Sequence, residues 1–282
     1  IACASCHKPA GSFTDNLDLS PGVNGKTGRG SMSLINVGFH YNGLFWDGRA
    51  HTLEEQALVP VENEVEMGET WEHVVDKLKS HPTYPQDFRK AFGIENVKDI
   101  SKELAAQAIA QFERSLISGG NSKYDRFARG EIFLDENEYN GYLEFFDFEP
   151  ALPDAECGHC HNAPLFATGD YFNNGLQEAA TLEDFADKGY GLITGKPSDN
   201  GKFKAPTLRN IAFTAPYMHD GRFKTLKEVV EHYNSGGKPS PNKNPLLYGL
   251  HLTEVQKADL IAFILTLTDS TVLTNPAYQS PF

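Results

Sequence analysis

Every cysteine in this 282-residue sequence belongs to one of two Cys-x-x-Cys-His pentapeptides, and these carry the most specific chemistry in the chain. The two motifs consist of Cys3, Cys6 and His7, and of Cys157, Cys160 and His161. Two thiols at this spacing can form thioethers with the two vinyl groups of a haem, while the following imidazole binds its iron. The motifs therefore predict two covalently bound haem c groups.

Zinc sites, redox dithiols and structural disulfides are the alternatives for a Cys-x-x-Cys pair. The two halves of a zinc ribbon lie within about 15–20 residues of each other, whereas these motifs begin at residues 3 and 157. A redox pair needs no following histidine and normally follows a strand of a βαβ unit, a pattern that we do not find here. Bacteria attach haem c outside the cytoplasm, so we expect a periplasmic protein whose signal peptide is not in this chain.

The composition limits the classes of partner. A formal net charge of −13 argues against a nucleic-acid-binding protein, because such binding depends on clustered Lys and Arg. The charge suits a basic protein partner, although an acidic surface also simply keeps a protein soluble. The longest apolar stretch, residues 260–268, is far shorter than the roughly 20 residues that cross a bilayer, so we expect no membrane span.

The chain repeats one pattern in its two halves. "SLINVGF" at 33–39 matches "TLRNIAF" at 207–213, and "DGRAHTLEEQALVP" at 47–60 matches "DGRFKTLKEVVEHY" at 220–233. Each half thus reads as a Cys-x-x-Cys-His motif, an Asn-centred segment, an Asp-Gly-Arg turn and a helix. We predict two cytochrome c-like domains, residues 1–120 and 121–282, each wrapping one haem.

The rest of the chain predicts a mostly α fold. Apolar residues recur at helical spacing in 101–116, and 253–268 begins with a Thr253/Gln256 capping box. No segment shows sustained strand-like alternation, and glycines and prolines punctuate long loops such as 188–206. We therefore expect helices joined by extended loops around the haems.

The repeated phrase ends in Pro60 in the first half and in Tyr233 in the second. Tyr233 shares a predicted apolar helix face with Leu226 and Val230, which would direct its phenol toward a haem. It is a candidate sixth ligand of the second iron, although it could equally be a packed aromatic. Met218, His219 and His232 are rival ligands. Proline has no donor atom, so the first iron would keep an open position.

At this point the sequence resembles the bacterial di-haem cytochrome c peroxidases, including the MauG-type enzymes. The resemblance covers nearly the whole chain and rests on both haem motifs and on "FWDGRA" (45–50), "EQA" (55–57), "VEMG" (65–68), "PTLRNI" (206–211) and "PYMHDGR" (216–222). It implies that the N-terminal haem reduces hydrogen peroxide and that the C-terminal haem relays or stores oxidising equivalents.

The resemblance also implies roles for single residues. Trp46 corresponds to the tryptophan between the haems, Glu66 to the distal glutamate and Gln56 to the distal-pocket glutamine. The tyrosine at position 233 matches the MauG-type enzymes, whereas the peroxidases proper have a methionine ligand. Many relatives cap the resting peroxidatic iron with a histidine, but residues 20–26 contain none.

A calcium ion between the domains is a further implication of the resemblance. Thr214 and Pro216 match its carbonyl donors, but Gly30 replaces an asparagine ligand. Arg49 and Arg222 either pair with haem carboxylates or close their own Asp-Gly-Arg turns, and the sequence does not decide between these roles.

The sequence thus favours a periplasmic peroxidase that takes electrons from a basic donor, such as a small cytochrome c or a cupredoxin. A MauG-like oxidase that uses peroxide to modify a specific protein partner is the alternative within the same fold. A plain di-haem electron carrier is the third hypothesis, which Pro60 argues against because a carrier needs no open iron.

Overall fold

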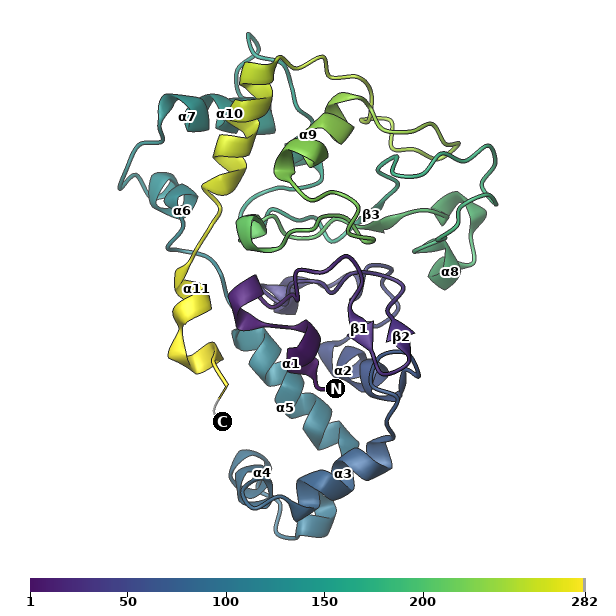
Figure 1. The fold of residues 1–282 in the computed structure, drawn as a ribbon. Helices are drawn as coiled ribbons and strands as arrows, with labels where there is room; N and C mark the ends of the chain where they lie inside the picture. The colour runs from purple at the N-terminus through teal and green to yellow at the C-terminus, as the bar shows by residue number, and fades with distance from the viewer. Residues whose placement is uncertain (281–282) are drawn as a thin grey trace.

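The computed structural model describes residues 1–280, which form two groups of helices arranged one above the other in Figure 1. The group that contains the N-terminus has five α-helices, α1 (Cys3–Cys6), α2 (Leu53–Glu62), α3 (Trp71–Ser80), α4 (Tyr84–Phe92) and α5 (Lys102–Ser115). The second group has another five, α6 (Lys123–Ala128), α7 (Glu136–Phe146), α8 (Gly191–Thr194), α9 (Leu226–Asn234) and α10 (Glu254–Leu265). Within the described residues, none of these helices is long and apolar enough to span a membrane.

Strands are few and short. β1 (Pro21–Gly22) pairs antiparallel with β2 (Gly25–Lys26), and β3 (Tyr171–Phe172) pairs antiparallel with β4 (Phe203–Lys204). Long loops and short 3₁₀ turns make up most of the remaining chain. The predicted mostly α fold with extended loops is confirmed.

The two helices that the sequence predicted most clearly form as expected. Ser101 caps α5 by accepting a hydrogen bond from the Leu104 N–H, and Thr253 caps α10 in the predicted capping box with Gln256. In the second group α10 packs against α7, and a core of buried side chains includes Phe145 of α7, Phe263 of α10 and Leu267, which lies just past α10.

The sequence repeat is a structural repeat. Asn36 and Asn210 both adopt a left-handed backbone with φ of 59°, and each precedes a 3₁₀ turn. The Asn36 N–H donates to the Leu116 carbonyl, just past α5, at 2.8 Å; the Asn210 N–H donates to the Leu267 carbonyl, just past α10, at 3.2 Å. In each half the asparagine therefore ties the repeat to the end of a long helix.

The two Asp-Gly-Arg turns also match. Arg49 donates to Asp47 at 3.0 Å, and Arg222 donates to Asp220 at 2.8 Å. Both arginines therefore close their own turns, and their pairing with haem carboxylates stays a prediction. The helices that follow, α2 and α9, begin in the same way, with the hydroxyls of Thr52 and Thr225 capping the first turn.

The C-terminal segment leaves the second group and returns to the first. α11 (Thr271–Thr274) runs beside α5 in Figure 1, and Val272 packs in one cluster with Phe13 and Leu116. The Tyr278 hydroxyl donates to the Ser115 carbonyl at the end of α5 at 2.6 Å. The division into domains at residue 120 stays a prediction, and the first group includes residues from both ends of the chain.

Candidate functional site

The two motif histidines have the same environment. Nδ1 of His7 lies 2.9 Å from the Phe13 carbonyl, and Nδ1 of His161 lies 3.1 Å from the Phe166 carbonyl. A carbonyl only accepts, so each Nδ1 carries the proton and each Nε2 keeps its lone pair. Burial lowers the pKa of both imidazoles, which favours the neutral form that binds a metal.

Each motif borders its own cavity. The first cavity is lined by the N-terminal motif together with residues from α2 and the loop that follows it, among them Cys3, Cys6, His7, Gln56, Pro60 and Glu66. The second cavity is lined by the C-terminal motif together with residues from α9 and two loops, among them Cys157, Cys160, His161, Asn174, Met218 and Tyr233. The structure thus separates the predicted site residues into two sets, one for each cavity.

The cysteines of the second motif suit thioethers better than thiolates. Burial raises the pKa of Cys157 to about 12 and of Cys160 to about 11, whereas zinc or a redox pair requires the deprotonated sulfur. Among the described residues, one group of three potential metal ligands comes together, and it contains none of the cysteines: Asp154, Glu156 and His159. The donor sets of both cavities therefore fit a haem, with a neutral imidazole on one side and two thiols at the edge.

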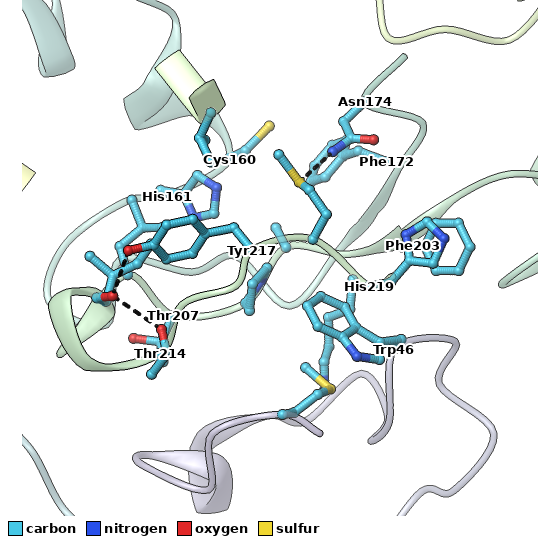
Figure 2. Close-up of a pocket in the computed structure, with 18 of the residues that line it drawn as sticks. Trp46, Cys160, His161, Phe172, Asn174, Phe203, Thr207, Thr214, Tyr217 and His219 are labelled. Carbon is cyan, nitrogen blue, oxygen red and sulfur yellow. Dashed lines mark hydrogen bonds between the residues drawn. The ribbon is translucent and has the colours of Figure 1, made fainter. Parts of the chain in front are cut away.

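Tyr233 projects from α9 into the second cavity, as its helix face predicted. Its oxygen accepts a hydrogen bond from Nδ2 of Asn174 at 3.3 Å, and the same amide lies 3.4 Å from the Met218 sulfur, the contact drawn in Figure 2. Burial raises the pKa of Tyr233 to about 12, and the Asn174 hydrogen bond acts in the opposite direction. Asn174 had no signal in the sequence, and it holds both candidate ligands in one place.

The corresponding helix of the first half ends differently. Pro60 lies in the last turn of α2 and lines the first cavity without offering a donor atom. Beyond α2, Asn63 turns the chain: its Oδ1 accepts from the Val65 N–H at 2.9 Å, and its Nδ2 donates to Oε1 of Glu66 at 3.1 Å. Asn63 therefore directs the Glu66 carboxylate, and the sequence did not identify it.

The β1–β2 hairpin supports this loop from the other side. The Val23 N–H donates to the Glu66 carbonyl at 3.0 Å, and a Cβ on Gly22 would lie 1.8 Å from the Val65 carbonyl oxygen. Only glycine permits so close an approach of two backbones. The segment in which the sequence lacks a capping histidine thus forms part of the wall that positions Glu66.

Glu66 and Gln56 both line the first cavity and are half-buried. Burial raises the pKa of Glu66, while the charge of Arg49 acts in the opposite direction. A raised pKa brings the carboxyl closer to the operating pH, which favours its use as a general acid–base group.

Trp46 lines both cavities. Its indole Nε1 donates to the Gly30 carbonyl at 2.9 Å, and its ring makes an edge contact with His219, with centroids 6.5 Å apart. Figure 2 shows Trp46 at the side of the second cavity nearest the first half, next to His219 and Phe203. The structure therefore places this aromatic side chain in the wall that the two cavities share.

A charge network joins the halves beside this wall. Arg29 donates to Asp47 at 2.6 Å and to both carboxylate oxygens of Asp187 at 2.7 Å. Asp47 also accepts from Arg49, so two guanidinium groups share its carboxylate. The network links the Asp-Gly-Arg turn of the first half to a loop of the second.

The predicted calcium donors Thr214 and Pro216 line the second cavity together with Gly30. The Thr214 hydroxyl donates to the Ile211 carbonyl at 3.2 Å, and the Asn16 amide donates to the carbonyl of Ala215 at 2.8 Å. Calcium binding stays a prediction.

Comparison with known proteins shows what this arrangement is similar to. Residues 1–132 match the family model described as di-haem cytochrome c peroxidase. The chain is 34% identical to cytochrome-c peroxidase IdrP1 of Pseudomonas sp. (strain SCT), over 96% of this chain and 76% of that protein. It is 31% identical to the methylamine utilization protein MauG of Methylorubrum extorquens, over 95% of this chain and 72% of that protein.

A solved structure agrees with these matches. The crystal structure of a MauG-like protein associated with microbial copper homeostasis superimposes with a TM-score of 0.90 at 34% identity, covering 100% of this chain and 87% of that one.

Proposed function

Because this chain belongs to the di-haem cytochrome c peroxidase family, an oxidoreductase family with two haem groups, we propose that it reduces hydrogen peroxide in its first cavity. In this proposal Cys3, Cys6 and His7 attach the haem of the first cavity. The second haem is attached by the C-terminal motif and relays or stores oxidising equivalents.

One observation carries the proposal: two repeats with the same frame present different residues to their haems. The last position of the repeated segment is Pro60 in the first half, where Pro60 and Glu66 both line the first cavity. In the second cavity the same position is Tyr233. A haem with a vacant sixth position beside a carboxylate suits peroxide, whereas a haem between an imidazole and a phenol suits electron transfer.

The haem of the first cavity supplies the redox centre at which the O–O bond of peroxide is reduced. Glu66 would move a proton between the two oxygens of peroxide, so that the departing oxygen leaves as water. Gln56 orients the incoming peroxide with its amide. Asn63 keeps the Glu66 carboxylate directed at the cavity, through the hydrogen bond described above.

The haem of the second cavity would supply electrons to the first cavity, and Trp46 lies in the wall between the two. Tyr233 is the sixth ligand of the second iron in this proposal, and a phenolic oxygen stabilises the more oxidised iron relative to a thioether. The second haem is then a reservoir of oxidising equivalents.

The proposed setting is the periplasm, with two covalently bound haem c groups and a basic electron donor such as a small cytochrome c or a cupredoxin. The net charge of −13 supports a basic donor, because opposite charges accelerate encounter. An inter-domain calcium ion held through Thr214 and Pro216 remains part of the proposal.

Peroxide titration of the resting protein tests this function. We expect one high-spin and one low-spin haem in the electron paramagnetic resonance spectrum, and a rapid reaction with one equivalent of peroxide. Two low-spin haems and no reaction would instead indicate the plain electron carrier.

A second candidate function is supported by Tyr233 and by the similarity to MauG proteins. In this case the chain uses peroxide to oxidise side chains of a specific protein partner. Rapid turnover with a reduced small cytochrome favours the peroxidase. A two-electron-oxidised state that persists in the presence of that donor favours the protein oxidase.

A further inference from the structure

Lys204 is a buried cation in the wall between the two cavities. Its residue is 3% exposed, and its backbone N–H donates to the Trp46 carbonyl at 2.9 Å, which fixes β4 against the tryptophan. Of the residues that line both cavities in the described chain, Lys204 is the one with an amine or guanidine side chain.

The charged groups described around the wall between the cavities give the Lys204 ammonium no carboxylate of its own. Its Nζ donates to the neutral Gly43 carbonyl at 3.2 Å. The negative charge of Asp47 acts on Lys204, but the Asp47 carboxylate already accepts hydrogen bonds from Arg29 and Arg49, and the Asp187 carboxylate accepts from Arg29. Three cationic side chains, of Arg29, Arg49 and Lys204, therefore lie near only two described carboxylates, of Asp47 and Asp187.

A buried ammonium without a counter-ion is costly, because desolvation penalises the charged form. Burial lowers the pKa of Lys204 to about 7, although the charge of Asp47 acts in the opposite direction. His40 also lines both cavities, and burial lowers its pKa to about 3, so its neutral imidazole adds no positive charge and provides no counter-ion for Lys204. An anion bound in either cavity would lie beside this amine and would stabilise its charged form.

Haem carries two carboxylate side chains, and this family binds two haems. We propose that Lys204 is the shared counter-cation of the two haems, binding one carboxylate side chain from each and raising the reduction potential of both irons. A positive charge favours the reduced, less positive iron, so a single ammonium acts on both centres in the same direction. This inference rests on the two haems alone, so it can fail while the peroxidase proposal stands, and the reverse.

Spectroelectrochemical titration of the holoprotein tests the proposal. We expect Lys204→Met and Lys204→Gln to lower both midpoint potentials by about a tenfold change in each ferric–ferrous equilibrium, which is about 59 mV for one electron. Lys202→Gln is the matched control, because Lys202 lies two residues away and has its own carboxylate partner, Asp199, at 2.9 Å. This control removes the same charge and should leave both potentials unchanged.

The pH dependence gives a second readout that a purely structural role would not change. Without the ammonium, the pKa of the haem carboxylates rises, so the potentials of Lys204→Met should vary with pH over a higher range than in the wild type. Unchanged potentials in both Lys204 variants, or a shift in one haem alone, would overturn the proposal. If Lys204→Met and Lys204→Gln fail to retain haem, recovery of loading in Lys204→Arg supports the charge, and failure of that variant as well overturns it.

Discussion

The first and second halves of the molecule share a frame and differ at the end of one helix. In both halves an asparagine in the left-handed conformation is tied to a long helix, an Asp-Gly-Arg turn closes on itself, and a threonine caps the next helix. The first half then turns at Asn63 and brings Glu66 to its cavity. In the second half the Asn234 side chain instead accepts from the Leu252 N–H at 2.8 Å, after Tyr233 has entered the cavity.

This difference shows that one set of residues determines the backbone geometry that the halves share, and another set determines the chemical character of each cavity. The geometry that the two halves share comes from residues such as Asn36 and Asn210, whose side chains accept hydrogen bonds from backbone N–H groups. The chemical character of each cavity comes from one helix position and the loop that follows it. Changes at those places should therefore alter one haem and leave the other as it was.

The largest effect should come from Tyr233→Phe. Removing the phenolic oxygen leaves the second iron without its proposed sixth ligand, so both haems should give high-spin signals in electron paramagnetic resonance. Tyr217→Phe is the control, because Tyr217 lines the same cavity but donates to the Ile211 carbonyl. An unchanged low-spin signal in Tyr233→Phe would show that Tyr233 is not the ligand, and Met218, the other side chain beside the Asn174 amide, would then be the next residue to replace.

Glu66→Gln should slow the reaction with peroxide by about 10²–10⁴-fold, the usual contribution of a positioned general acid–base group. The wild-type rate should fall as the pH decreases through the pKa of Glu66, because protonation removes the base. Burial places that limb above the ordinary value of 4.5. Stopped-flow absorbance over a pH series measures both effects. If Glu66→Gln keeps both the wild-type rate and its decrease at low pH, another group transfers the proton.

Asn36→Ala and Asn210→Ala should destabilise the two halves to a similar extent. Each change leaves a buried N–H, of Ser118 or Asp269, without its acceptor, at a cost of about 1–3 kcal/mol. The glycine variants should cost less, because alanine at φ of 59° adds about 1–2 kcal/mol of strain that glycine avoids. Guanidinium unfolding measures the difference, and equal losses for alanine and glycine would contradict the argument from the left-handed backbone.

Asn63→Ala should give the smallest effect. Loss of one hydrogen bond to the Glu66 carboxylate costs about 1.4 kcal/mol, which corresponds to about a tenfold slower peroxide reaction. The acid limb should also move to higher pH, because the amide N–H stabilises the carboxylate. Asn24→Ala is the control, since that amide donates to the neighbouring Glu64 carbonyl at 2.8 Å. A change in rate with no movement of the limb would indicate a general disturbance of the loop.

The sequence predicted the elements that depend on local patterns. The helical spacing of 101–116 and the Thr253/Gln256 box gave α5 and α10, and the repeat identified matching turns and helices. The helix face also placed Tyr233 correctly in the second cavity. These features need only neighbouring residues for their explanation.

The residues that the sequence missed depend on contacts between distant segments. Asn174 reaches Tyr233 from 59 positions away, and Lys204 reaches Gly43 across 161 positions. Asn63 is closer to Glu66, but an asparagine before an acidic run is no more than a turn signal until its cavity is known. Sequence periodicity does not reveal such long-range contacts. The roles of Lys204, Asn63 and Asn174 were therefore found only from the three-dimensional structure.

The return of the C-terminal segment has a consequence for biosynthesis. Val272 and Tyr278 complete the packing around Phe13 and the end of α5, so the half that is translated first cannot finish its core until residues beyond 270 have emerged. We expect early folding intermediates to expose that apolar patch and to depend on chaperones. The two halves should then unfold together, with a single cooperative transition, despite their similar internal design.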